Sequence, residues 1–320
     1  MCNEKMNYQE KTNNLLHEQR SNWPLLADNL EGLKNARLKS FQLVGFSFQV
    51  QYNPMRITST SAKIDRASIK ARPCFLCSAN RPEEQNRVLF ENSYEILCNP
   101  YPILREHFTI ASLNHVPQEI GTSFAHFLEI SKALPDLVTL YNAPKCGASA
   151  PDHLHFQSGN VGFMPMENEF DTLKSRFGIE LSHKPQISVT AINDGFRRFI
   201  VLESDEKESL LNAFKPIYKY MKELVGGEEP MLNILSWYSK GWRVMVFMRH
   251  KHHPWQYDAE GDQNILISPG AVDMGGVLTA PLEKDFNKIT KEDIKDIMNQ
   301  VSMSAEGFEK MIHYLTNLLK

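Results

Sequence analysis

The sequence of 320 residues lacks the features that define several large protein classes. It contains five cysteines, an odd number, and only Cys74 and Cys77 have an informative spacing, which argues against a disulfide framework. The longest apolar runs, such as residues 242–248, are far shorter than the roughly 20 residues of a membrane span. The N-terminal segment has no apolar stretch of the kind found in secretory signals. We therefore expect a cytoplasmic protein with no membrane partner.

Charge of one sign is not in excess either. Lys and Arg number 35 against 38 Asp and Glu, a net charge of −3. A protein that binds nucleic acid through its overall charge is basic, so we do not expect a nucleic-acid partner. Hydrophobic residues make up 42% of the chain, an ordinary share for a globular protein. The length predicts about two domains, or one duplicated fold.

An order of elements that occurs twice is the main feature of the chain's organisation. The first half predicts strand, strand, helix, strand, strand at residues 94–98, 107–112, 118–134, 137–142 and 153–157. The second half predicts the same order at residues 186–192, 197–203, 205–224, 231–237 and 242–248, with an Asn-Asp-Gly hairpin turn at 193–195. We expect an α+β fold whose duplicated halves form a mostly antiparallel sheet flanked by helices.

Local patterns predict the remaining segments. Residues 1–20 are polar and indicate a mobile lead-in, and a helix is expected over residues 23–37. Residues 41–50 predict one strand, and residues 53–82 predict mostly loop.

We divide the chain into the lead-in of residues 1–20, a catalytic half over 21–180 and a second, degenerate half over 181–320. Near the end of the chain, Thr290 and Asp293 form a capping box that predicts a C-terminal helix.

The alternation of polar and apolar residues at 153–157 (HLHFQ) is the first pattern that indicates a catalytic site. On a strand this pattern places His153, His155 and Gln157 on one face. A neutral imidazole is a nucleophile toward phosphorus, and a nearby amide can donate to an oxygen that gains charge. The preceding small-residue loop, with Gly147 and Ser149, offers backbone N–H groups to phosphate. The alternatives are a polar strand on a wet surface and a histidine pair in the core.

The Cys74-Phe75-Leu76-Cys77 pair is the second signal. Two cysteines need two further ligands to make a closed zinc site. We propose His115 and His153 for them, with His107 as the competing fourth ligand. Such a structural Zn²⁺ site would tie the cysteine loop to the strand that carries His155.

These motifs resemble the histidine-triad superfamily. HFTIASLNH, a helix, a strand and then HLHFQ, with CxxC upstream, is similar to the branch of galactose-1-phosphate uridylyltransferases, diadenosine tetraphosphate phosphorylases and GDP-hexose phosphorylases. The resemblance implies that His155 is the nucleophile, that Gln157 steadies the phosphoryl group, and that Ser149 contacts phosphate. It also implies zinc ligands at Cys74, Cys77, His115 and His153, and a homodimer as in the uridylyltransferases.

Traces of the resemblance continue into the second half. MLNILSW and GWRVMVFMR, at 231–237 and 241–249, and VDMGGVLTAPLEKDFNKIT, at 272–290, are similar to the phosphorylases of this branch. The chain departs from the branch in two ways. Plant-type GDP-hexose phosphorylases lack the CxxC, and the second-half histidines of the uridylyltransferases have no match here.

Basic residues elsewhere suggest further phosphate contacts. Arg249 and Lys251 lie in the densest cationic stretch and are candidates for a phosphate clamp, the alternative being a solvated loop. Arg56, in the loop before the CxxC pair, is a third candidate, the alternative being ordinary surface charge.

The sequence therefore predicts a nucleotidyltransferase or phosphorylase. It would pass a nucleoside monophosphate from an NDP-sugar or dinucleoside polyphosphate, through a covalent nucleotidyl-histidine, to phosphate or a sugar phosphate. The alternatives are a hydrolase of the same superfamily and a zinc-stabilised nucleotide-binding protein without activity.

Overall fold

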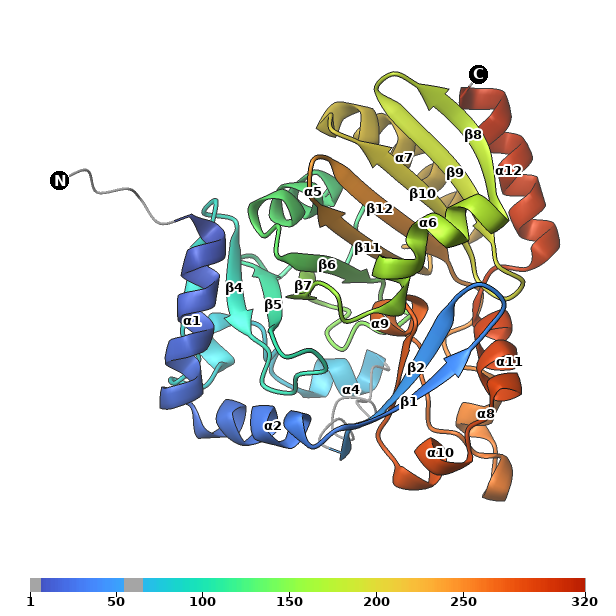
Figure 1. Ribbon diagram of the computed structural model, residues 1–320. Helices are drawn as coiled ribbons and strands as arrows, with labels where there is room; N and C mark the ends of the chain where they lie inside the picture. The colour runs from blue at the N-terminus through green and yellow to red at the C-terminus, as the bar shows by residue number, and fades with distance from the viewer. Residues whose placement is uncertain (1–6, 55–65, 320) are drawn as a thin grey trace.

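A computed structural model describes residues 7–54 and 66–319 of the chain (Figure 1). The strands are β1 (Arg37–Gln42), β2 (Ser47–Tyr52), β3 (Arg87–Phe90), β4 (Tyr94–Cys98), β5 (His107–Ser112), β6 (Leu137–Asn142), β7 (His155–Asn160), β8 (Gly178–Lys184), β9 (Ile187–Asn193), β10 (Arg198–Ser204), β11 (Leu232–Tyr238), β12 (Trp242–Met248) and β13 (Val277–Ala280). The helices are α1 (Tyr8–Asn22), α2 (Pro24–Lys34), α4 (Arg66–Ala71), α5 (Phe124–Ala133), α6 (Pro165–Phe177), α7 (Lys207–Leu224), α8 (Trp255–Asp258), α9 (Ala271–Met274), α10 (Glu283–Lys288), α11 (Lys291–Val301) and α12 (Ala305–Leu319), with 3₁₀ turns at Ser78–Asn80 and Gly261–Gln263.

Ten strands form one antiparallel sheet in the order β3-β4-β5-β7-β6-β11-β12-β10-β9-β8. Read inward from each edge, both halves follow the same path, in which the fifth strand of the half lies between the third and the fourth. The halves join where β6 pairs with β11, for example Leu140 with Leu235. This confirms the predicted α+β fold with duplicated halves.

The two faces of the sheet are covered by different elements (Figure 1). Helices α1, α5, α7 and α12 cover one face, over a core that includes Phe156 and Val246. On the other face, α6, α9, α11 and the small sheet β1-β2-β13 pack over a core that includes Leu235 and Phe247. Because both faces are covered, central strands such as β5 are buried at every position. Continuous apolar runs, rather than strict alternation, follow from that burial.

Residues 8–20 form most of a packed helix in place of the predicted lead-in. Asn7 caps α1, and its side chain and that of Glu10 each bind the other residue's backbone N–H, in a capping box. Leu15 and Leu16 enter the core. The buried Gln19 donates to the carbonyl of Glu84 at 2.6 Å, so its polar side chain serves a tertiary contact that composition does not reveal.

The strand expected over residues 41–50 is instead part of a hairpin. β1 and β2 pair antiparallel, and Gly45 takes a φ of +89° in the turn between them, a conformation that glycine adopts without strain. The predicted Thr290–Asp293 capping box is confirmed at the start of α11. The domain boundary between residues 180 and 181 stays a prediction, and it falls within β8.

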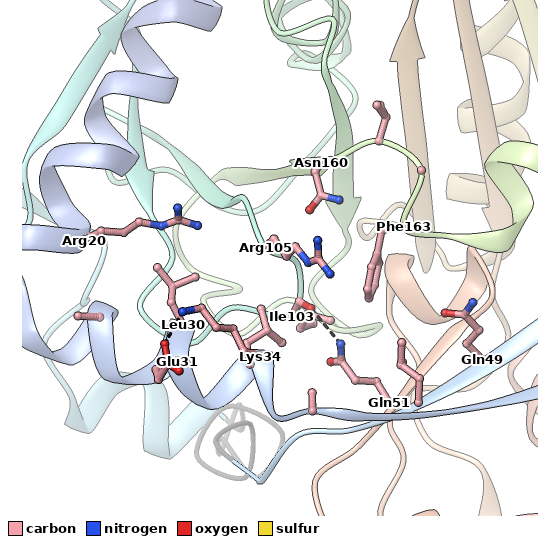
Figure 2. Close-up of a pocket in the computed structure, with 16 residues that line it drawn as sticks. Arg20, Leu30, Glu31, Lys34, Gln49, Gln51, Ile103, Arg105, Asn160 and Phe163 are labelled. Atoms are coloured by element: carbon pink, nitrogen blue, oxygen red, sulfur yellow. Dashed lines mark hydrogen bonds and ion pairs between the residues drawn. The ribbon is translucent and has the colours of Figure 1, made fainter.

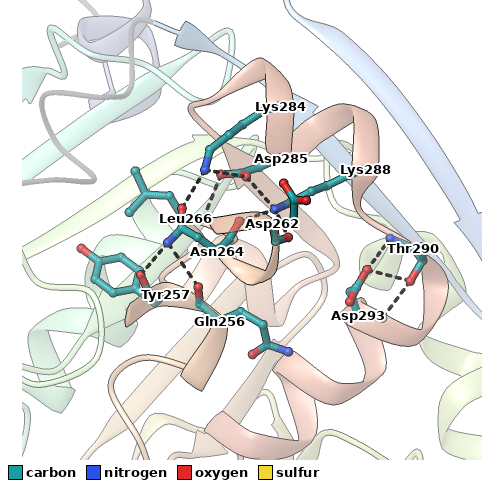
Figure 3. A network of polar contacts seen from close by, with 10 residues as sticks. All are labelled: Gln256, Tyr257, Asp262, Asn264, Leu266, Lys284, Asp285, Lys288, Thr290 and Asp293. Atoms are coloured by element: carbon teal, nitrogen blue, oxygen red, sulfur yellow. Dashed lines mark hydrogen bonds and ion pairs between the residues drawn. The ribbon is translucent and has the colours of Figure 1, made fainter. Parts of the chain in front are cut away.

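The connection from β12 to α11 is held by polar contacts rather than by a long element (Figure 3). The buried Asp285 carboxylate accepts the N–H of Leu266 at 2.9 Å. Lys284 donates to Asn264, whose amide donates to the carbonyl of Tyr257 at 3.0 Å. These contacts fix residues 256–266 against α10.

Candidate active site and metal cluster

β7 lies between β5 and β6, and its register decides which side chains share a face. His155 pairs with Ala111, Gln157 with Thr109, and Gly159 with His107. Directly paired residues point to the same side of a sheet, so His155, Gln157 and His107 lie on one face. Leu104 packs against Gly159, where a Cβ would lie 2.7 Å from Cδ2 of Leu104.

His155 is buried, with 3% of its surface exposed. Its Nδ1 lies 2.8 Å from the carbonyl oxygen of His153. A carbonyl only accepts, so Nδ1 carries the proton and Nε2 keeps its lone pair. Burial lowers the pKa of His155 to about 4, so the ring is neutral at pH 7. Within residues 7–54 and 66–319, Nε2 makes no hydrogen bond.

The backbone of His155 is clamped by Gln118, which has no exposed surface. The side-chain oxygen Oε1 of Gln118 accepts the backbone N–H of His155 at 2.7 Å, and the side-chain amide of Gln118 donates to the His155 carbonyl at 2.9 Å. The same amide donates to the carbonyl of Asn142 on β6. Gln118 thus fixes the start of β7. Sequence reasoning missed it, because a buried glutamine before a helix carries no spacing signal.

The orientation of the Gln157 amide is set by His107. The N–H of Ile103 donates to Nδ1 of His107, so the proton of that ring lies on Nε2. Nε2 lies 2.8 Å from Oε1 of Gln157 and donates to it. The amide NH₂ of Gln157 therefore points away from His107 and is available as a donor.

Four side chains meet beside the start of β7. The ligand atoms of Cys74, Cys77, His115 and His153 all lie within 4.8 Å of one another. Nδ1 of His153 lies 3.3 Å from Sγ of Cys74, and Nδ1 of His115 lies 3.2 Å from Sγ of Cys77. The structure thus places His115 in the cluster, and it places His107 against Gln157 instead.

The donor set of this cluster fits a metal ion. Two thiols and two imidazoles are a set that tetrahedral zinc prefers. Nε2 of His153 donates to the Ser112 carbonyl, 2.8 Å away, and Nε2 of His115 lies 3.5 Å from the Asp152 carboxylate. Such outer partners leave the Nδ1 lone pairs facing the cluster.

The Cys74 thiol is also prepared to act as a ligand. Its partial burial raises its pKa, but hydrogen bonds with His153 and the backbone outweigh that effect and bring the pKa to about 6. A thiolate is the form that binds metal.

His153 does not share a strand face with His155 and Gln157, contrary to the prediction. β7 begins only at His155, and the side chain of His153 turns toward the cysteines. The resulting arrangement lets His153 contribute its ring to the cluster with Cys74, Cys77 and His115, and its carbonyl to the hydrogen bond with His155.

The predicted phosphate loop is a tight turn against the second half. Gly147 has a φ of +110°, and a Cβ there would approach Cα of Gly270 at 3.1 Å, so only glycine fits. The carbonyl of Ser149 accepts from Arg72 at 2.7 Å. Phosphate contacts by Gly147 and Ser149 remain predictions.

Arg249 is not free to clamp phosphate, which corrects that prediction. It is 3% exposed, and all five guanidinium N–H groups have partners. The acceptors are the carbonyls of Val301, Pro269, Lys251 and His252 and the side-chain oxygen of Asn233. Lys251 is exposed on the adjoining loop, and Arg56 lies outside the described residues.

Asn233 extends this network toward the loop that precedes β7. Its amide donates to Oδ1 of Asn142 at 2.7 Å and to the carbonyl of Cys146 at 2.8 Å. Arg249 and Asn233 therefore support the Gly147 turn from the second half.

Two family models match the chain. A domain family of unknown function, DUF4922, matches residues 15–160, and a family described as the GDPGP1-like C-terminal domain matches residues 175–320.

Curated relatives match parts of the chain. A galactose-1-phosphate uridylyltransferase of Halalkalibacterium halodurans is 35% identical over 106 residues, which are 28% of this chain and 21% of that protein. One from Staphylococcus saprophyticus is 26% identical over 198 residues, 53% of this chain and 38% of that protein. The chain thus spans well under half the length of these relatives.

Solved structures show the same fold. The yeast Ap4A phosphorylase Apa2 in complex with AMP superposes with a TM-score of 0.61 at 13% identity, covering 93% of this chain and 98% of that chain. Its complex with Ap4A gives 0.59 at 15% identity, covering 91% and 98%. Among residues 7–54 and 66–319, no helix combines the length and apolar composition needed to cross a bilayer.

Proposed function

We propose that this chain transfers a nucleoside monophosphate through His155. The premise is that the chain belongs to the histidine-triad superfamily, in the branch of galactose-1-phosphate uridylyltransferases, diadenosine tetraphosphate phosphorylases and GDP-hexose phosphorylases. The observation that carries the proposal is the hydrogen bond from Nδ1 of His155 to the carbonyl of His153, which leaves the Nε2 lone pair open beside Gln157. The relatives' names support nucleotidyl transfer as the reaction class.

The first step makes a phosphorus–nitrogen bond. Nε2 of His155 attacks the α-phosphorus of an NDP-sugar or dinucleoside polyphosphate, and the bond from that phosphorus to the bridging oxygen breaks. The sugar phosphate or remaining nucleotide leaves with the electron pair. The imidazolium that forms keeps its Nδ1 proton on the His153 carbonyl, so no proton has to move.

The second step reverses the first with another acceptor. An oxygen of inorganic phosphate or of a sugar phosphate attacks the phosphorus, and the bond to Nε2 breaks. In both steps the Gln157 amide, held by His107, donates to a phosphoryl oxygen as its charge rises. Gln118 keeps the His155 backbone in place throughout.

The metal in this proposal is zinc in a structural role. Cys74, Cys77, His115 and His153 would hold it, and its chemistry is to cross-link their loops. Since His153 belongs both to the cluster and to the hydrogen bond with His155, the cluster sets the position of that carbonyl.

A test of the reaction class is the dependence of turnover on an acceptor. The protein is incubated with UDP-glucose, GDP-glucose, ADP-glucose or diadenosine tetraphosphate, with and without phosphate or galactose 1-phosphate. We expect a nucleoside diphosphate with phosphate as acceptor, or a new nucleotide sugar, the nucleoside diphosphate galactose, with galactose 1-phosphate. Release of nucleoside monophosphate at the same rate without any acceptor would show a hydrolase instead.

A further inference from the structure

A cavity of about 950 Å³ lies at the opposite end of β7 from His155 (Figure 2). Its walls come from α1, α2, β2 and the loops that precede β5 and follow β7. Asn160 lines it and stands five positions after His155, roughly 16 Å along an extended strand. Pockets for small molecules usually measure about 300–1,000 Å³. The cavity is therefore of ligand size and separate from the nucleophile.

The charges that line this cavity are mainly positive. Arg20, Lys34 and Arg105 stand against one carboxylate, Glu31. Lys34 pairs with Glu31 at 2.5 Å. Neither the guanidinium group of Arg20 nor that of Arg105 makes a hydrogen bond or ion pair with any other described residue, and Figure 2 shows both side chains at the cavity. Two guanidinium groups without a carboxylate partner favour an anion, and phosphate is the anion that arginine binds with two parallel hydrogen bonds.

An unpaired buried acceptor also lines the cavity. Gln51 is 3% exposed, and its amide donates to the carbonyl of Ile103 at 3.2 Å. Its Oε1 has no hydrogen-bond partner among the described residues. A buried acceptor without a partner is uncommon and costly in proteins. A hydroxyl or amine from a bound molecule would satisfy it.

The remaining walls suit a small organic molecule. Oδ1 of Asn160 accepts the N–H of Glu106, so its amide NH₂ is left as a donor. Leu30, Ile103 and Phe163 add apolar surface. The combination of cations, amide groups and an apolar wall matches a phosphorylated molecule with hydroxyl groups rather than a simple inorganic ion.

We propose that this cavity is a second ligand site, which binds a small hydroxyl-bearing organic phosphate. Arg20 and Arg105 take the phosphate, and Oε1 of Gln51 accepts from a hydroxyl. Sugar phosphates and nucleotides share this chemistry, so the experiment includes both.

Calorimetric titration of the full chain tests the site. The probes are glucose 1-phosphate, GMP and inorganic pyrophosphate, added to the wild type, to the Arg20→Ala/Arg105→Ala pair and to Gln51→Met. A matched control, Lys215→Ala/Lys240→Ala, removes two exposed charges from α7 and the β11–β12 turn. Thermal melts confirm that each variant is folded.

Three results together are expected. At least one organic phosphate binds the wild type. The Arg20→Ala/Arg105→Ala substitution weakens the affinity for that phosphate at least tenfold. Gln51→Met weakens the same affinity several-fold and leaves the affinity for pyrophosphate unchanged. The lysine pair leaves its binding within about twofold, as expected for distant screened charges. Nucleotidyl transfer at His155, assayed separately, persists in the arginine pair, so failure of this site and failure of the proposed function are distinguishable.

Other outcomes overturn the proposal. The first is that no organic phosphate loses affinity when the two arginines are replaced. The second is that the lysine pair loses as much affinity as the arginine pair. The third is that pyrophosphate binds as tightly as the organic phosphates and that Gln51→Met changes the affinity of neither. The last two would show a general response to charge rather than a site.

Discussion

The two halves of the sheet have the same strand order, but on one face of the sheet the first half carries polar side chains where the second half carries apolar ones. A row of paired residues crosses the sheet from Thr109 and Gln157 through Leu140 and Leu235 to Met245 and Val201, all on the same side. In the first half this face carries His155, Gln157 and His107 with small neighbours. In the second half it carries buried apolar side chains such as Met245 and Phe247.

This difference shows how the two halves of a duplicated fold can differ in what they contribute to the protein. The second half fills its face with a core under α6, α9 and the small sheet, and so contributes rigidity. The first half leaves polar groups on its face and fixes them with Gln118, the His107–Gln157 contact and the cluster of Cys74, Cys77, His115 and His153. Substitutions in the first half should therefore cost rate, and those in the second half should cost stability.

The largest expected effect is the loss of the proposed nucleophile, His155. His155→Ala should lower kcat/KM about 10⁴-fold or more, as removal of a covalent catalyst does. Since His155 contributes one side-chain hydrogen bond, the free energy of unfolding should fall by no more than about 2 kcal/mol. Steady-state kinetics and denaturant unfolding measure the two quantities. His313→Ala, at an exposed position on α12, is the control, and a His155→Ala variant with full activity would refute the assignment.

The matching change in the second half is Phe247→Ala. Phe247 has no exposed surface, and its deletion should lower the free energy of unfolding by about 3–5 kcal/mol. The rate per folded molecule should stay near the wild-type value, because β12, which carries Phe247, lies three places from β7 in the order of the sheet. A loss of rate with unchanged stability would break the division between the halves.

Metal removal should loosen one half only. We expect chelation, or Cys74→Ser with Cys77→Ser, to increase deuterium uptake at residues 72–80, 112–118 and 150–157, the segments that the cluster joins. Uptake in β9, β10 and β12 should not change. Cys146→Ser is the control, because Cys146 lies outside the cluster and a serine hydroxyl can keep its bond to the Leu232 carbonyl. Uniform loosening of both halves would contradict this prediction.

The smallest expected effect comes from substitutions of His107 that distinguish its contact with Ile103 from its contact with Gln157. His107→Asn keeps an acceptor for the Ile103 N–H but loses the donor to Gln157, so kcat should fall about tenfold, less than the loss of an entire oxyanion donor. KM and thermal stability should change little. His107→Gln places an amide donor near Gln157 and should retain more activity than His107→Asn. Equal kcat values in both variants would remove His107 from the account.

Much of the fold could be predicted because repeated local patterns survive in the sequence. The bounds of β4, β5, β6 and β12 match the prediction, since each is a compact apolar run between turn residues. α1 and the β1–β2 hairpin could not be predicted correctly, because their stability comes from partners far along the chain, as the Gln19–Glu84 contact shows.

The candidate site divides in the same way. The spacing of Cys74 and Cys77 and the HLHFQ motif predict a metal site and His155, and the structure brings the four proposed ligands together and adds the contact from Nδ1 of His155 to the His153 carbonyl. Gln118 and the role of His107 depend on strand register and ring tautomer, which no spacing encodes. Arg249 was misassigned because a cationic stretch does not reveal that five acceptors surround one of its members.

The most direct test of the central claim is the mass of the intact protein after brief incubation with each of the four donors in the absence of an acceptor. The account predicts an acid-labile increase equal to one nucleoside monophosphate with at least one donor, present in the wild type and His313→Ala and absent in His155→Ala. An adduct that persists in His155→Ala would place the nucleophile elsewhere. No adduct with any donor, in a folded protein that consumes that donor, would contradict a nucleotidyl-histidine intermediate that accumulates.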